Sequence, residues 1–218
     1  MFPPMPSEAA AVRVTRSFQA SLARIAARSG RLTAAEWAAL GSWNEADIAR
    51  FLTRVDPVWS AARAATVNAS AGYYAVITDT PALIVDPASL GFPVDPRAPF
   101  TAYWHGLAEG RDWVDALAAG EARALSTGVD LVAGTSRRTA SLVAGTGVVG
   151  WRRVTTGNSC RWCATISTQR YKSAESADFG HDNCDCIVTP IYGDRDPGQV
   201  INEVRRQDLA QTVPAVRV

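Results

Sequence analysis

Apolar residues recur every three or four positions through the first two thirds of the chain. Near the N-terminus this spacing includes Val14, Phe18, Leu22 and Ile25, which share one face of a helix with about 3.6 residues per turn. The same period returns in later stretches, up to about Val143. The pattern predicts a chain that is mainly helical up to that point.

Local signals divide the first helical stretch into several helices. Gly30 is expected to end the first helix, and Thr33–Glu36 has the spacing of a capping box, in which a hydroxyl and a carboxylate satisfy backbone donors. Ser42–Glu45 repeats that spacing. Asp56 followed by Pro57 is typical of an N-cap and a first helical position. This pair predicts a fresh or kinked helix.

Prolines interrupt the helical pattern between residues 80 and 99. Each proline removes a backbone donor and clashes with the preceding helical turn, so a regular helix is excluded there. The chain begins with another proline-rich stretch. We predict a flexible arm over residues 1–11 and a helical body over residues 12–147, with a proline-rich connection over residues 80–99.

The composition changes from Val148 onward. Residues 148–155 and 186–191 are rich in β-branched residues, and each run predicts a strand. We expect residues 148–193 to form a small module, followed by a tail over residues 194–218. The predicted fold class is mainly α, with a helical N-terminal body and a small α+β, Cys/His-rich C-terminal module.

The module contains all four cysteines and one of the two histidines of the chain. Cys160 and Cys163 form a CxxC pair, and His181, Cys184 and Cys186 follow after a spacer. Two compact groups of this kind can close a tetrahedral zinc site. We expect Cys160, Cys163 and two of the other three residues to bind zinc, so five candidate ligands compete for four positions.

Other arrangements of the same cysteines stay open. Four thiols can form two disulfides, but the N-terminus lacks the pattern of a secretory signal, and disulfides are typical of secreted proteins. Alternatively, the cysteines are small buried apolar residues in a metal-free core.

Charge and hydropathy limit the classes of partner. The formal net charge is +1, which argues against a dedicated nucleic-acid binder. No apolar run approaches the roughly 18 residues of a membrane span. We therefore expect no membrane among the partners. A small-molecule substrate is not expected either.

The chain lacks the GxSxG and HExxH motifs of common hydrolases. His105 lies between Trp104 and Gly106, where a packing or surface role is expected. A cysteine nucleophile (Cys160, Cys163 or Cys184) paired with His181 would be a protease arrangement. Four clustered thiols are more simply explained as ligands, so no catalytic residue is assigned.

An ordered set of motifs in the C-terminal part carries a family resemblance. The motifs are Gly150–Val154, Cys160–Ala164, Tyr171–Glu175 and His181–Cys186, ending in Pro190. Together they resemble the C-terminal module of phage Mu F-like head-morphogenesis proteins, most closely the version found in tailed phages of actinobacteria. The matching part covers about a quarter of the chain, and the helical N-terminal part is similar to that group in general plan.

The resemblance implies a minor capsid protein that acts in procapsid assembly near the portal. Its implied partners are the portal protein and capsid or scaffold proteins, with the packaged DNA as a further contact. Its implied location is the virion, inside the capsid, after assembly in the host cytoplasm.

Two alternative functions remain. The actinobacterial group is often labelled a capsid maturation protease, so processing of scaffold or capsid protein is the first. The second is a zinc-dependent nucleic-acid-binding module, in which Arg152, Arg153 and Arg161 contact phosphates.

Overall fold

The computed structural model describes residues 7–79, 81–91, 93–144, 147–156, 161–178 and 186–212. The first part contains α1 (Glu8–Ala38), α2 (Glu45–Thr78), the 3-10 turn η1 (Pro87–Leu90), α3 (Ala98–Ala108) and α4 (Trp113–Val143). The second part contains β1 (Gly150–Val154), α5 (Arg161–Ile166), β2 (Arg170–Tyr171), α6 (Ala174–Asp178), β3 (Ile187–Ile191) and α7 (Pro197–Thr212). The predicted fold class, a helical body followed by a small α+β part, is confirmed.

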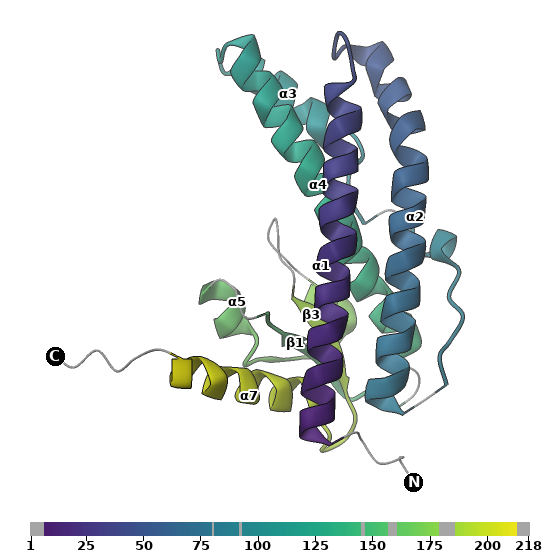
Figure 1. Cartoon of the computed structure of the whole chain (residues 1–218), viewed down its shortest axis with the longest axis vertical. Helices are drawn as coiled ribbons and strands as arrows, with labels where there is room; N and C mark the ends of the chain where they lie inside the picture. Colours follow the sequence, from purple (N-terminus) through teal and green to yellow (C-terminus); the bar gives the residue numbers. More distant parts are fainter. Residues whose placement is uncertain are drawn as a thin grey trace, which may run out of the picture.

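The long helices α1, α2 and α4 pack side by side, and α3 packs along α4 (Figure 1). An aromatic cluster fills the space between them: the Trp37 and Phe100 ring centroids are 4.9 Å apart, and those of Phe51 and Phe100 are 5.6 Å apart. All three side chains are buried. The apolar faces that the sequence spacing predicts therefore meet in one core.

α1 runs unbroken through Gly30, so the predicted helix end at this residue is wrong. A Cβ atom on Gly30 would lie 2.8 Å from the Leu125 carbonyl oxygen of α4. A Cβ atom on Gly128 of α4 would in turn lie 2.8 Å from the Gly30 Cα. The two glycines allow α1 and α4 to approach closely, which is a packing role rather than a cap.

The predicted capping box at Thr33 is also wrong. The Thr33 hydroxyl donates to the Ser29 carbonyl at 2.8 Å and accepts from the Trp59 indole N–H at 2.9 Å, so it joins α1 to α2. The N-cap of α2 is Asn44, two residues later than predicted. Its side-chain oxygen accepts from the Asp47 N–H at 3.2 Å, and Asp47 completes the capping box.

Two other boundaries differ from the sequence prediction. α1 begins at Glu8, inside the predicted arm, because the Ser7 hydroxyl accepts from the Ala10 N–H at 3.4 Å and caps the helix. α2 continues through Pro57, so a fresh helix does not begin there. None of the helices within the described ranges is long and apolar enough to cross a membrane.

The second half of the proline-rich connection is held against α2 and α4. Arg63 of α2 donates to the Pro87 carbonyl, and Arg138 of α4 donates to the Leu90 carbonyl at 2.7 Å. Pro93 packs against Gly134 so closely that a Cβ atom there would lie 2.5 Å from the proline Cβ. These contacts fix the path of the connection across the helical body.

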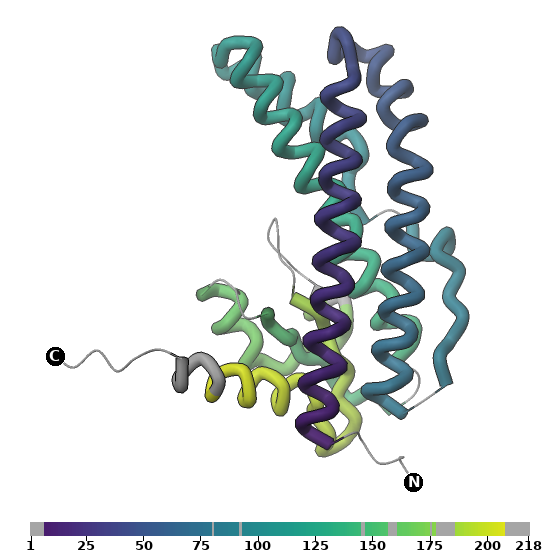
Figure 2. The backbone as a smooth tube through the Cα atoms, viewed as in Figure 1, coloured from purple at the N-terminus to yellow at the C-terminus, as the bar shows by residue number. Residues whose placement is uncertain are grey.

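The strands form an antiparallel sheet in the order β2-β1-β3. Trp151 of β1 is paired with Tyr171 on one side and Pro190 on the other. Figure 2 shows the C-terminal part of the chain, which includes this sheet, beside the N-terminal half of α1. The two segments are far apart in the sequence. The Tyr74 hydroxyl of α2 donates to the Val188 carbonyl at 2.5 Å, and one buried cluster includes residues from both parts. The sheet therefore shares a core with the helices.

Candidate functional site

The structure places Cys163 and Cys186 against each other. Cys163 lies in α5, Cys186 directly precedes β3, and the side chains are only 2% and 3% exposed. Cys186 also borders a small apolar cavity between α1 and α4, which includes Leu22 and Val132. The fold thus brings one cysteine from each half of the Cys/His motif into a shared buried contact.

Two cysteines supply half of the ligands that a structural zinc site needs. Among the residues that the structure describes, no group of three or more His, Cys, Asp or Glu side chains is arranged to hold a metal. The other predicted ligands, Cys160, His181 and Cys184, lie outside the described residues. The Cys163–Cys186 contact fits a site shared by both halves of the motif, and zinc binding stays a prediction.

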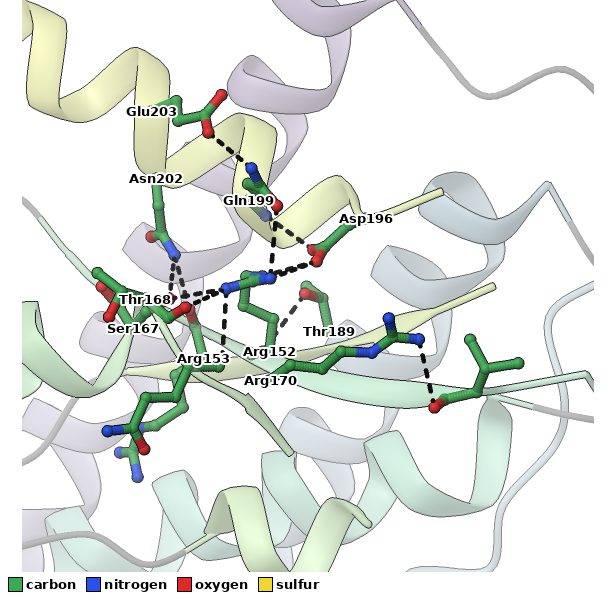
Figure 3. A network of polar contacts seen from close by, with 12 residues as sticks. Arg152, Arg153, Ser167, Thr168, Arg170, Thr189, Asp196, Gln199, Asn202 and Glu203 are labelled. Carbon is green, nitrogen blue, oxygen red and sulfur yellow. Dashed lines mark hydrogen bonds and ion pairs between the residues drawn. The ribbon is translucent and has the colours of Figure 1, made fainter. Parts of the chain in front are cut away.

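Arg152 of β1 lies at the centre of a polar network that joins α5 to α7 (Figure 3). Its Nη1 donates to three successive carbonyls after α5, those of Ser167 at 3.4 Å, Thr168 at 2.8 Å and Gln169 at 3.3 Å. Its Nε and Nη2 each lie 2.7 Å from Asp196 Oδ2. The guanidinium therefore fixes the turn that follows α5 and ties it to the start of α7.

Arg153 points to the opposite face of the sheet, since successive residues of a strand alternate. It is fully buried, and its Nη1 donates to the Ala177 carbonyl of α6 at 3.2 Å. The prediction that Arg152 and Arg153 contact phosphates is therefore wrong, because the folded chain buries both guanidinium groups and uses them internally. Arg161, at the start of α5, is exposed.

The sequence interpretation missed the role of α7. Asn202 Nδ2 donates to the Arg153 carbonyl at 2.8 Å, and its Oδ1 accepts from the Thr155 N–H at 3.2 Å. One side-chain amide thus extends the backbone pairing of β1. The signal for this helix was visible: Asp196 followed by a proline is an N-cap pair, and Asp196 accepts from the Gln199 N–H at 2.9 Å.

Two buried tyrosines attach the module to neighbouring backbone. The Tyr171 hydroxyl donates to the Ile166 carbonyl at 3.0 Å, and the Tyr192 hydroxyl donates to the Ala144 carbonyl. Burial raises the pKa of both phenols above the ordinary value. The phenols therefore stay neutral donors at neutral pH, one at the end of α5 and the other at the end of α4.

His105 lies apart from the cysteines, on α3. It is exposed, and its Nε2 is 3.1 Å from Glu109 Oε1, one helical turn later. This placement agrees with the surface role expected from the sequence.

A model of the VG15 protein family matches residues 7–207. The chain belongs to the VG15 protein family. The match covers the helical body, the sheet and most of α7. Searches of curated proteins and of solved structures found no match.

Proposed function

We propose that this VG15 family protein is a phage minor capsid protein that acts in head morphogenesis near the portal. The ordered motifs of the C-terminal part support this function through their resemblance to Mu F-like proteins. The observation that carries the proposal is the buried contact between Cys163 and Cys186 inside a module that is built into the helical body.

The burial of Cys163 favours a structural role over a catalytic one. A protease nucleophile must reach the carbonyl carbon of a substrate, whereas the Cys163 side chain is 2% exposed. Arg152 and Arg153, on the strand that precedes the CxxC pair, bind carbonyls after α5 and in α6. These contacts favour a module that stabilises the protein and presents no reactive centre at Cys163.

A protein partner fits the opposite end of the molecule. The end of α3 and the start of α4 carry large exposed apolar side chains: Trp113 is 64% exposed, Val114 54%, Leu107 39% and Trp104 37%. Tryptophan is enriched at the energetic centres of protein interfaces. A head protein such as the portal or capsid protein is the partner we propose for the molecule.

The proposal also includes a zinc site and a location for the protein. Zinc would be held by Cys163 and Cys186 together with two of Cys160, His181 and Cys184, and it would crosslink the two halves of the motif. The location would be the virion interior, after assembly in the host cytoplasm. Contact with packaged DNA would then involve exposed groups such as Arg161 rather than the buried arginines of β1.

Co-expression with the phage portal, scaffold and capsid proteins tests the proposal. Procapsids are purified, their subunits are quantified by mass spectrometry, and the intact mass of the capsid protein is measured. We expect the chain in particles at low copy number and an unchanged capsid-protein mass when Cys163→Ser replaces the parent. A processed capsid protein that depends on Cys163 in a well-folded chain would favour the protease instead.

A further inference from the structure

Residues 81–86 connect α2 to η1 without belonging to a helix or a sheet. The sequence is Pro-Ala-Leu-Ile-Val-Asp, and the segment runs as an extended stretch beside α2 (Figure 1). Ile84 is fully exposed, at 102%, and Leu83 is 49% exposed, whereas Val85 packs against the core. Leu, Ile and Val in an extended segment, with Ile84 outward and Val85 inward, have the character of a strand.

The backbone of this segment is available for pairing. Residues 82–85 form no backbone hydrogen bond with the part of the chain that the structure describes. A row of unpaired N–H and C=O groups beside exposed apolar side chains such as Leu83 and Ile84 is the feature that makes an edge strand a template for another chain.

The segment is anchored where it enters η1. The Asp86 carboxylate accepts from the Ala88 N–H at 2.9 Å, and Arg63 donates to the Pro87 carbonyl. Further along, Arg138 fixes the Leu90 carbonyl at 2.7 Å. A segment held in extended form loses less conformational entropy on binding than a free peptide would.

We propose that residues 82–85 pair, by strand addition, with the open edge of a β-sheet in another head protein. Such pairing satisfies the backbone groups of alternate residues, and a pocket on the partner sheet would receive Ile84. The choice of probe proteins below rests on the proposed function.

The ends of the segment favour a multi-stranded partner over a second copy of the chain. Pro81 has no N–H to donate, and Asp86 leads into η1, so pairing is limited to residues 82–85. Two copies would form only a short two-stranded ribbon, which is marginal in water. The edge of an existing sheet provides a preformed strand and a packed face. Pro81 and Asp86 also limit uncontrolled aggregation at the apolar residues between them.

Hydrogen–deuterium exchange of the full chain tests the proposal. The chain is measured alone, with purified portal protein and with purified capsid protein. We expect the amides of residues 82–85 to exchange fast in the free chain. With one of the two proteins, the amides of alternate residues, Ile84 included, should exchange at least about tenfold more slowly, because one neighbouring strand bonds every second residue. Slow exchange with neither protein overturns the proposal, and protection in the chain alone that grows with its concentration assigns the segment to self-association.

Two variants at one position provide the matched control. Ile84→Pro removes the backbone donor and should weaken binding to the protecting protein by about tenfold or more, whereas Ile84→Val keeps the donor and the branched side chain. Both variants should have the melting temperature of the parent, because Ile84 is fully exposed. Equal binding by both variants contradicts strand addition. Presence of the chain in procapsids without protection at residues 82–85 overturns strand addition alone, and its absence from procapsids overturns the proposed function.

Discussion

The Arg152 guanidinium and the Asp196 carboxylate lie 2.7 Å apart and join β1 to the start of α7. Both side chains are mostly buried, at 10% and 16% exposure. The same guanidinium binds the carbonyls after α5. One arginine thus holds together β1, the turn after α5 and the start of α7.

Replacing Arg152 by alanine should lower the free energy of unfolding by about 3 kcal/mol, because it removes the cation paired with Asp196 Oδ2 and the donor to the carbonyls after α5. Arg170→Ala is the matched control on the neighbouring strand. Arg170 is exposed and makes one long contact, 3.4 Å from the Val149 carbonyl, so the expected loss is below about 0.5 kcal/mol. Urea denaturation measures both, and equal losses would show that the Arg152 network does not stabilise the module.

Glycine substitutions test the close approach of α1 and α4. Gly30→Ala should destabilise the protein by about 1–3 kcal/mol, because the new Cβ would lie 2.8 Å from a backbone carbonyl of α4. Gly72→Ala provides the control in the neighbouring helix, since no atom lies within 4 Å of its added Cβ. That variant should gain about 0.5–1 kcal/mol from helix propensity. Stabilisation by both alanines would remove the packing explanation for Gly30.

Alkaline pH should destabilise the fold. Burial raises the pKa of Tyr74 well above its ordinary value of 10.0, with Tyr73 nearby adding to the shift. The folded-state pKa is raised, so the stability contribution is complete below the unfolded-state pKa and is lost as pH rises above it. The free energy of unfolding should fall above about pH 10, by up to about 1.4 kcal/mol per pH unit for each such phenol.

Tyr74→Phe keeps the ring and removes the titrating group, so its unfolding free energy should depend less steeply on pH in this range. The variant should also be less stable at neutral pH, by about 1–2 kcal/mol, because the Val188 carbonyl loses its donor. Urea midpoints between about pH 8 and pH 11 provide the comparison. Parallel pH profiles for parent and variant would exclude Tyr74 as the source.

Zinc binding at the cysteine cluster predicts a linked loss of metal and stability. Cys163→Ser removes a ligand, so the purified variant should hold less zinc and should melt at least about 5 °C below the parent. A chelator should lower the melting temperature of the parent but not that of the variant. If the parent holds no zinc and is insensitive to the chelator, the cysteines act as buried apolar residues and the metal prediction is wrong.

The sequence predicted the helical body and two strands because local periodicity determines them. It misread Gly30 and Thr33, since each has the local form of a helix boundary and acquires its role only through Gly128 and Trp59 on other helices. A tertiary contact that satisfies a hydroxyl or fills the space beside a glycine leaves no local signal.

The candidate site was likewise predictable from the sequence only in part. The spacing of the motif selected Cys163 and Cys186, which the fold brings into contact. The arginines of β1 could not be assigned from spacing, because their partners are carbonyls after α5 and in α6 that become neighbours only when the chain folds. Two adjacent arginines are typical of a basic surface patch, whereas the structure buries both guanidinium groups.

The copy number of the chain in procapsids assembled with and without the portal protein tests the central claim most directly. The measurement is quantitative mass spectrometry of purified particles, with the capsid protein as the internal reference. A minor capsid protein that acts near the portal should be retained at low copy number when the portal protein is present and should be lost when it is omitted. Absence from both kinds of particle, or equal amounts in both, would contradict the account.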